Sequence, residues 1–195
     1  MLANVIVLDS FFEDPHSIVD IALKQKFYSV NDNPNDYDNI QSDKPISYLG
    51  SRTLSLKYIL EESLYHQIDN KILSAFTLNT PYNSSISIDA DMSSLFHALF
   101  ENDLYEDKWI HKDTVLYAGI VYLNEHLEGD NHGTLLDGQI IPYKFNRMVL
   151  YRADMPHAAM NGYGKTINDS RLTLNFFINT INISIINTDI TGIVE

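Results

Sequence analysis

The segment 109–124, with the sequence WIHKDTVLYAGIVYLN, indicates both a fold class and a kind of site. Its second half, Val115–Leu123, is apolar and rich in β-branched and aromatic residues, as expected of a strand buried on both faces. His111 and Asp113 stand just before it. Because side chains alternate along an extended chain, residues at this spacing point to the same side. The segment therefore predicts a buried strand with an imidazole and a carboxylate at one end.

A second histidine later in the chain could complete a metal site. His157 follows Met155 and Pro156, at the end of another predicted strand, Met148–Tyr151. Two histidines and one carboxylate occupy one face of an octahedral metal and leave other positions open, as in non-haem Fe(II) oxygenases. Spacing alone is equally compatible with a surface histidine beside a solvated carboxylate and with a histidine in a loop.

Arg171 opens the predicted strand 171–177, RLTLNFF, and is the candidate anion-binding residue. Arg171, Thr173 and Asn175 share one face of this strand, and the residues between them share the other, apolar face. A guanidinium inside a barrel needs a carboxylate partner. An arginine at an exposed strand edge is the simpler alternative.

The remaining sequence predicts a mainly β fold with flanking helices. One helix starts at Asp14 and Pro15, which suit the N-cap and first helical positions. A second runs from Leu56 to Phe76, with apolar residues every three or four positions. Asn31–Asn39 is expected to be an exposed loop. Two further strands are predicted, Ser85–Asp89 and Ile181–Ile186.

Two helices followed by many strands favour an antiparallel sandwich or barrel, with the helices packed on one sheet. No boundary between domains is evident, so residues 1–195 are predicted to form one domain. Residues 1–84 would give mostly helical support, and residues 85–187 would form the β core with the site.

Composition excludes several kinds of protein. The chain has 195 residues, a formal net charge of −13 and no cysteine. Disulfides and thiolate metal sites are therefore impossible, and the acidic charge argues against long nucleic acid and anionic membranes. No apolar run approaches the roughly 18 residues that span a bilayer, and residues 1–9 do not resemble a signal peptide. We expect a cytoplasmic protein.

From Trp109 to Phe177 the chain resembles the Fe(II)- and 2-oxoglutarate-dependent oxygenases, in particular their prolyl-hydroxylase-like branch. The matching elements occur in the family's order: His111–Asp113, Ile120–Asn124, Gly133–Thr134, Phe145–Tyr151, Met155–His157 and Arg171–Phe177. Phe11–Pro15 and Gly50–Thr53 carry a weaker likeness to small oxygenases encoded by bacteriophages.

The resemblance implies a double-stranded β-helix (a jelly roll) that uses Fe(II), O2 and 2-oxoglutarate. His111, Asp113 and His157 would bind the metal and form the catalytic set. Arg171 would bind the distal carboxylate of the co-substrate, with Tyr122 and Thr173 beside it. The presence of Asp113 favours hydroxylation over halogenation.

Two features depart from the family pattern. The insert Ala158–Ser170 between His157 and Arg171 is longer than in many relatives. The family's additional co-substrate tyrosine, upstream of the His-x-Asp pair, has no clear match, and three residues are candidates: Phe96, His97 and Tyr105.

The expected substrate is a small molecule or peptide, specifically a peptidyl or free amino acid of prolyl type, by family analogy alone. A nucleobase or nucleoside hydroxylase and a non-catalytic jelly-roll binding module are the alternatives. His16 and His66 are expected on helix surfaces. His126 and His132 are expected in a loop, 125–132, whose acidic residues Glu128 and Asp130 would suit a cationic or neutral substrate.

Overall fold

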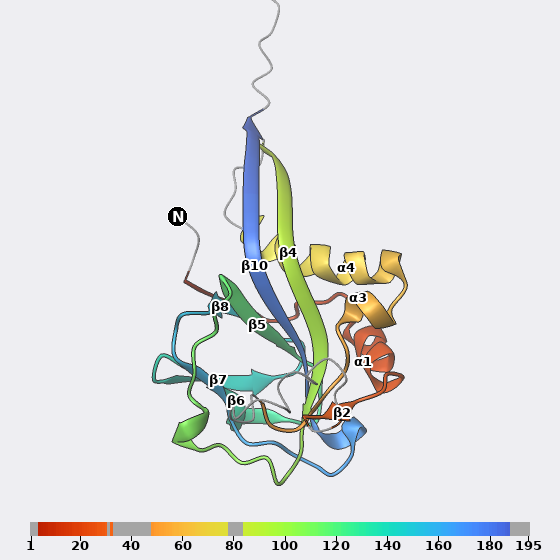
Figure 1. The fold of residues 1–195 in the computed structure, drawn as a ribbon, viewed down its shortest axis with the longest axis vertical. Coiled ribbons are helices and arrows are strands. Elements are labelled where there is room, and N and C mark those ends of the chain that lie inside the picture. Colours follow the sequence, from red (N-terminus) through yellow and green to blue (C-terminus); the bar gives the residue numbers. More distant parts are fainter. Residues whose placement is uncertain (1–3, 31, 33–47, 78–83, 188–195) are drawn as a thin grey trace, which may run out of the picture.

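The computed structural model describes residues 4–30, 32, 48–77 and 84–187, and these form two antiparallel sheets (Figure 1). The expected loop Asn31–Asn39 lies outside this part of the chain, Asp32 excepted. The larger sheet has the order β1-β8-β5-β10-β4-β3-β2, with strands at Val5–Leu8, Met148–Arg152, Tyr117–Tyr122, Arg171–Asn187, Ser84–Leu99, Ser51–Arg52 and Tyr28–Ser29. The smaller has the order β7-β6-β9, with strands at Gln139–Lys144, Glu128–Leu136 and His157–Ala159.

The helices begin where the sequence predicts, but the second is divided. Helix α1, Pro15–Leu23, is capped by Asp14, whose carboxylate accepts a hydrogen bond from the Ser17 amide at 3.1 Å. The expected helix Leu56–Phe76 is instead α3, Leu56–Ile59, and α4, Glu62–Leu73, followed by a 3-10 turn. The backbone at Leu60 is extended (ψ 156°) and separates the two. No helix in the described residues is long and apolar enough to cross a membrane.

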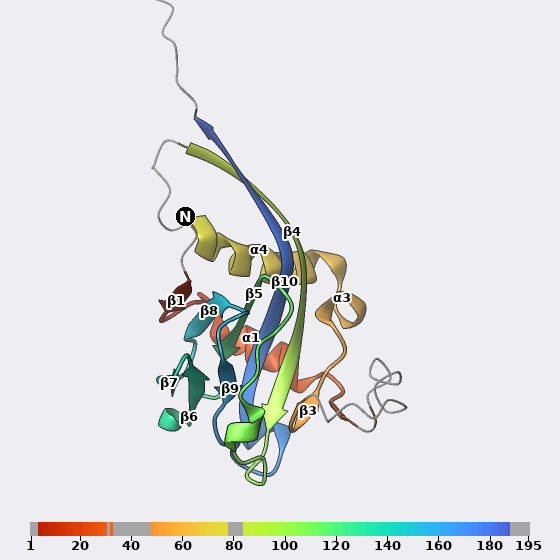
Figure 2. The same ribbon diagram turned by 60° about the vertical axis from the view of Figure 1, so that its left-hand side comes forward.

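Two strands are much longer than the sequence predicts. The expected strand Ser85–Asp89 is the start of β4, which continues to Leu99. The expected strands 171–177 and Ile181–Ile186 are one strand, β10, because a register shift between Ile178 and Thr180 bends the strand without ending it. Paired along their whole length, β4 and β10 extend beyond the rest of the sheet (Figures 1 and 2).

The expected loop 125–132 is partly a strand. Strand β6 begins at Glu128, so His132 and Gly133 lie within it, and the β6–β7 turn falls at Asp137 and Gly138. Both turn residues have positive φ, 48° and 79°, as a two-residue hairpin turn requires. Gly133 therefore lies inside a strand and not in a turn.

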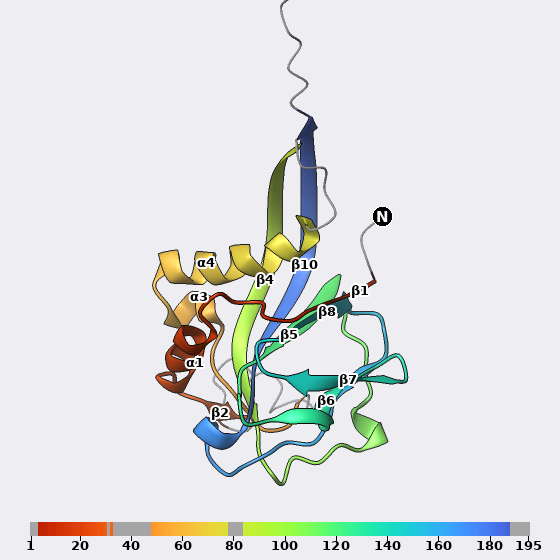
Figure 3. The same cartoon turned by 180° about the vertical axis from the view of Figure 1, so that it is seen from behind.

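The larger sheet has two different faces, because side chains alternate along its strands. Leu172, Leu174 and Phe176 of β10 are buried in one apolar core with Ile68 and Ile72 of α4. The opposite face packs against the smaller sheet through a second core, which includes Ile120, Tyr122, Leu136, Tyr143 and Val149. Figures 2 and 3 show the helices on one side of the larger sheet and β6 and β7 on the other.

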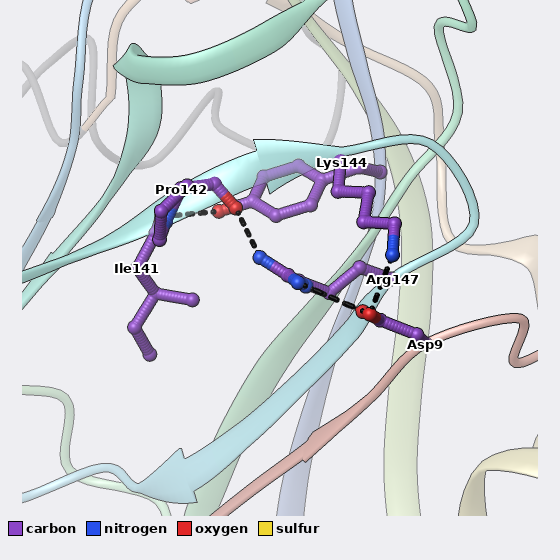
Figure 4. Close-up of polar contacts among 6 residues, drawn as sticks. Asp9, Ile141, Pro142, Lys144 and Arg147 are labelled. Carbon is purple, nitrogen blue, oxygen red and sulfur yellow. Dashed lines mark hydrogen bonds and ion pairs between the residues drawn. The ribbon is translucent and has the colours of Figure 1, made fainter.

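A polar contact joins the N-terminal segment to the turn between β7 and β8 (Figure 4). The Asp9 carboxylate accepts hydrogen bonds from Arg147 Nε at 2.6 Å and Lys144 Nζ at 2.7 Å. The hydrogen bond from Arg147 has the largest effect on the pKa of Asp9, and together with the hydrogen bond from Lys144 it lowers that pKa to about 2. These two contacts hold the segment between β1 and α1 against the β core.

Candidate metal centre and its cavity

The structure brings His111, Asp113 and His157 together, although 46 positions separate the first from the last. One ligand atom from each lies within 4.8 Å of the others. His157 Nε2 is 3.3 Å from Asp113 Oδ2, and His111 Nε2 is 3.6 Å from Asp113 Oδ1. The three donor atoms therefore face a common point, as ligands of one ion do.

The main chain sets the spacing of the two imidazoles. His111 and His157 form an isolated β-bridge, in which each amide donates to the other's carbonyl at 3.0 and 2.9 Å. The Asp113 amide donates to the Ala153 carbonyl at 2.9 Å. His111 thus belongs to an isolated bridge and not to a continuous strand. The backbone hydrogen bonds of His111 and Asp113 are enough to place the two residues together.

Backbone carbonyls also orient both imidazole rings. His111 Nδ1 lies 2.8 Å from the Trp109 carbonyl, and His157 Nδ1 lies 2.9 Å from the Met155 carbonyl. A carbonyl only accepts, so each Nδ1 carries a proton, which leaves Nε2 as the ring nitrogen that can bind a metal through its lone pair.

The carboxylate is held in its ionised form. Burial alone would raise the pKa of Asp113, but the hydrogen bond from His157 and the charges of His157, His111 and Arg52 outweigh it and lower that pKa. Two imidazole nitrogens and one carboxylate suit a first-row divalent ion with open coordination positions. The residues present therefore fit Fe(II).

A cavity of about 810 Å³ opens beside these three residues. Its walls come from β3, β4, β5, β6, β8, β9 and β10 and from the segment 108–113. Beyond the three ligands, the polar and charged residues of its lining are Arg52, His97, Lys108, Thr134, Arg171 and Asn175. Its volume lies in the range of pockets that hold small ligands.

Arg171 reaches this cavity as a buried cation. It is 2% exposed, its Nε donates to the His132 carbonyl at 2.6 Å, and one terminal nitrogen donates to the Gly133 carbonyl at 2.8 Å. Within the described residues, no carboxylate lies within 4.0 Å of its guanidinium. Burial lowers the pKa of Arg171. A buried guanidinium with neutral partners, on a cavity wall, is a site for an acidic ligand.

Tyr122 and Thr173 are fully buried and lie behind the cavity wall. The Tyr122 hydroxyl lies 2.9 Å from Thr134 Oγ1, and Thr173 Oγ1 donates to Asn175 Oδ1 at 2.6 Å. Thr134 and Asn175 line the cavity. Tyr122 and Thr173 therefore do not line the cavity themselves, but they hydrogen-bond to two residues that do.

Of the three candidates for the upstream co-substrate residue, only His97 lines the cavity. Its Nε2 donates to the Leu49 carbonyl at 2.7 Å, and burial, then the charge of Arg52, lowers its pKa well below the usual value. Phe96 lies in the core on the helix side. The Tyr105 hydroxyl donates to Asp107 at 2.7 Å, and Tyr105 does not line the cavity.

Other cavity residues were not assigned a role from the sequence. Arg52 lies in Gly50–Thr53, where only a family likeness drew attention to it. The alternation of β10 already placed Asn175 on the face of Arg171. His126 is exposed and does not line the cavity, and His132 contributes its backbone carbonyl to Arg171.

No protein-family model matches the sequence, and a comparison with curated proteins finds no match. Solved structures do match. A prolyl-4-hydroxylase of Pseudomonas putida has 13% identity and a TM-score of 0.50, covering 90% of this chain and 92% of that chain. A prolyl hydroxylase of Trichoplax adhaerens, in complex with a peptide fragment of hypoxia inducible factor, has 10% identity and a TM-score of 0.52, covering 90% and 83%.

HygX of Streptomyces hygroscopicus, with nickel and 2-oxoglutarate bound, has 11% identity and a TM-score of 0.51, covering 92% of this chain and 84% of that chain. At such identities the likeness is one of fold. The chain therefore has the jelly-roll fold found in 2-oxoglutarate- and Fe(II)-dependent oxygenases, which confirms the predicted fold class.

Proposed function

We propose that this protein is an Fe(II)- and 2-oxoglutarate-dependent dioxygenase that hydroxylates a C–H bond of its substrate. One observation carries the proposal. One cavity is lined by three side chains whose metal-ligand atoms converge and by the buried guanidinium of Arg171, which has no carboxylate partner among the described residues. A binding module would have no use for both.

Each residue has a role that follows from its position. His111, Asp113 and His157 would hold Fe(II), and Arg171 would bind the distal carboxylate of 2-oxoglutarate. Tyr122 and Thr173 would orient Thr134 and Asn175 in the cavity wall. The bound metal and co-substrate supply the oxidation of a C–H bond by O2, with release of succinate and CO2. The protein orients the reactants and limits the access of water.

We propose a peptidyl or free amino acid of prolyl type as the substrate. The fold shared with two prolyl hydroxylases supports this choice, as does a cavity of small-ligand size. Nucleosides are the alternative to be tested against it.

The test has two parts. Fe(II) and 2-oxoglutarate, added without oxygen, should give a visible metal-to-ligand charge-transfer band in the intact protein. His111→Ala should abolish the band. His66→Ala, at an exposed histidine on α4, should leave it unchanged. No band in the intact protein, or an unchanged band in His111→Ala, contradicts the proposed function.

Succinate release then identifies the substrate class. Under air, a proline-containing peptide or free proline should stimulate succinate formation, and nucleosides should not. Stimulation by nucleosides alone would select the nucleoside hydroxylase.

A further inference from the structure

Tyr151 is a buried tyrosine in the cavity wall, beside the metal centre. The centre of its ring lies 4.8 Å from that of the His157 ring, and the residue lines the cavity although it is only 5% exposed. Within the described residues, its hydroxyl has no hydrogen-bond partner. A buried polar group is normally hydrogen-bonded, so a free hydroxyl on a cavity wall is available to a ligand.

The other tyrosines of the same core bond to the protein itself. Tyr122, Tyr143 and Tyr151 all belong to the core between the two sheets. The Tyr122 hydroxyl lies 2.9 Å from Thr134 Oγ1, and the Tyr143 hydroxyl accepts from the Asn124 amide at 2.7 Å. The free hydroxyl of Tyr151 is therefore not a general feature of tyrosines in this core.

The register of the larger sheet places Tyr151 far from Arg171. Tyr151 of β8 pairs with Ala118 of β5, and Ala118 pairs with Phe177 of β10. Phe177 is six positions beyond Arg171 on the same strand, about 20 Å along an extended chain. All four residues line the cavity. Tyr151, in contact with the His157 ring, therefore belongs to the metal end of the cavity and Arg171 to the other end.

The charges near the hydroxyl agree with this placement. Burial raises the pKa of Tyr151, the charge of Asp113 raises it further, and the opposing effect of Arg171 is smaller. Asp113 is the only acidic residue that lines the cavity in the described part of the chain. Glu128 and Asp130, which suggested a cationic or neutral substrate, are exposed and do not line it. The Tyr151 hydroxyl thus keeps its proton and is a hydrogen-bond donor at the metal end.

His97, another buried residue of the cavity wall, cannot serve as such a donor. Its Nε2 already donates to the Leu49 carbonyl at 2.7 Å. Burial, then the charge of Arg52, lowers the pKa of His97 well below its usual value, so Nδ1 carries no proton and can only accept. Carboxylate and keto oxygens of a ligand need donors, which Tyr151 can supply and His97 cannot.

We propose that the Tyr151 hydroxyl donates a hydrogen bond to the chelating end of 2-oxoglutarate, the C1 carboxylate and C2 keto group that would bind the metal. This inference rests on the proposed function, which supplies the ligand. Tyr151 and Arg171 would then hold the two ends of one co-substrate. Tyr151 would fix the orientation of the end that reacts, and Arg171 would bind the distal carboxylate.

Tyr151→Phe is the direct test, because it keeps the ring against His157 and deletes the hydroxyl alone. The anaerobic charge-transfer band moves electron density from the metal to the chelating keto group, and a hydrogen bond to that group stabilises the excited state. We therefore expect Tyr151→Phe to shift the band to shorter wavelength. It should also weaken 2-oxoglutarate binding about three- to tenfold, as the loss of one hydrogen bond does, and leave metal affinity unchanged.

Two control variants separate this role from packing and from the distal contact. Tyr143→Phe removes a buried hydroxyl that has protein partners and does not line the cavity. It should lower the denaturation midpoint and leave the band and the affinity unchanged, whereas Tyr151→Phe should leave the midpoint unchanged. Arg171→Gln, at saturating 2-oxoglutarate, should weaken binding without shifting the band, because its contact is at the other end of the co-substrate.

Three results would overturn the proposal. The first is an unshifted band in Tyr151→Phe, whatever the affinity, since a change in packing can weaken binding by itself. The second is an equal shift in Tyr143→Phe, and the third is a Tyr151→Phe variant that does not fold, which would show that the hydroxyl has a structural role. Absence of the band from the intact protein would instead reject the proposed function, and this inference with it.

Discussion

Asp69 and Asp113 are both carboxylates partly or fully withdrawn from water, yet their pKa values move in opposite directions. Asp69 lies on α4 against the larger sheet, where burial raises its pKa and the hydroxyls of Tyr65 and Ser94 only partly offset this effect. Asp113 lies on the cavity side, where two imidazoles and Arg52 outweigh burial and lower its pKa. Neighbouring charge, more than depth, decides which carboxylate remains ionised.

The difference extends to the two faces of the sheet. On the helix side an apolar core makes ions unfavourable. On the cavity side, imidazoles and guanidinium groups line the cavity. Substitutions on the helix side should therefore change stability, whereas those on the cavity side should change ligand binding.

The largest effect is expected at Asp113. Asp113→Asn removes the anionic ligand, so metal binding and succinate formation should fall below detection. The free energy of unfolding should change by less than about 1 kcal/mol, because no core packing is lost. Metal titration and denaturant unfolding of the same variant check both statements. Retained metal affinity would show that the three residues do not form the metal centre.

Phe176 and Phe177 are adjacent residues on opposite faces and allow a matched test of the helix side. Phe176 is 0% exposed in the helix-side core, so Phe176→Ala should lower the free energy of unfolding by about 3–5 kcal/mol. Phe177 lines the cavity, so Phe177→Ala should cost less than half as much. Denaturant unfolding measures both, and equal losses would contradict the assignment of faces.

Arg171→Gln should weaken binding of 2-oxoglutarate about 10- to 100-fold, because a charge-assisted contact with a carboxylate is lost. Titration of the visible charge-transfer band with 2-oxoglutarate gives the affinity. Arg152→Gln is the control, since Arg152 is exposed and paired with Asp154. An unchanged affinity in Arg171→Gln would remove the co-substrate role from this residue.

The smallest effect is expected at Asp69 and depends on pH. A carboxyl whose pKa is raised by folding binds its proton more tightly in the folded state, so its contribution to stability falls as pH rises above the ordinary value of 3.8. Asp69→Asn should therefore be as stable as the intact protein near pH 4 and more stable, by up to about 1 kcal/mol, at pH 7. Unfolding at both pH values measures this. A loss of stability at pH 7 would show that the ionised carboxylate is favourable there.

The sequence was most informative where pattern and position are local. The structure agrees with three local predictions: the proximity of His111 and Asp113, the strand after them, and the alternation of faces after Arg171. The break at Leu60 was missed because the apolar period continues through it. Strand β6 was missed because the polar, glycine-containing segment before Thr134 looks like a loop, and its pairing with β7 and β9 supplies the hydrogen bonds that make it a strand.

The pairing of Arg52 with His97 was beyond sequence reasoning. It depends on the register of β3 against β4, which brings together two residues 45 positions apart, and on the close approach of these strands that Gly50 permits. Neither follows from a periodic pattern. Which residues of distant strands lie side by side in the cavity wall is known only once the register of those strands is known.

The reciprocal amide–carbonyl bonds between His111 and His157 have a practical consequence for purification. Since the polypeptide itself maintains the distance between the rings, a site of this kind accepts several first-row ions. Their affinities follow the Irving–Williams series, in which Fe(II) binds more weakly than nickel or zinc, so metal availability decides occupancy. Nickel from an affinity column or zinc from the growth medium would then displace iron, and a preparation stripped with chelator and reloaded with ferrous salt under argon is the proper starting material for every assay above.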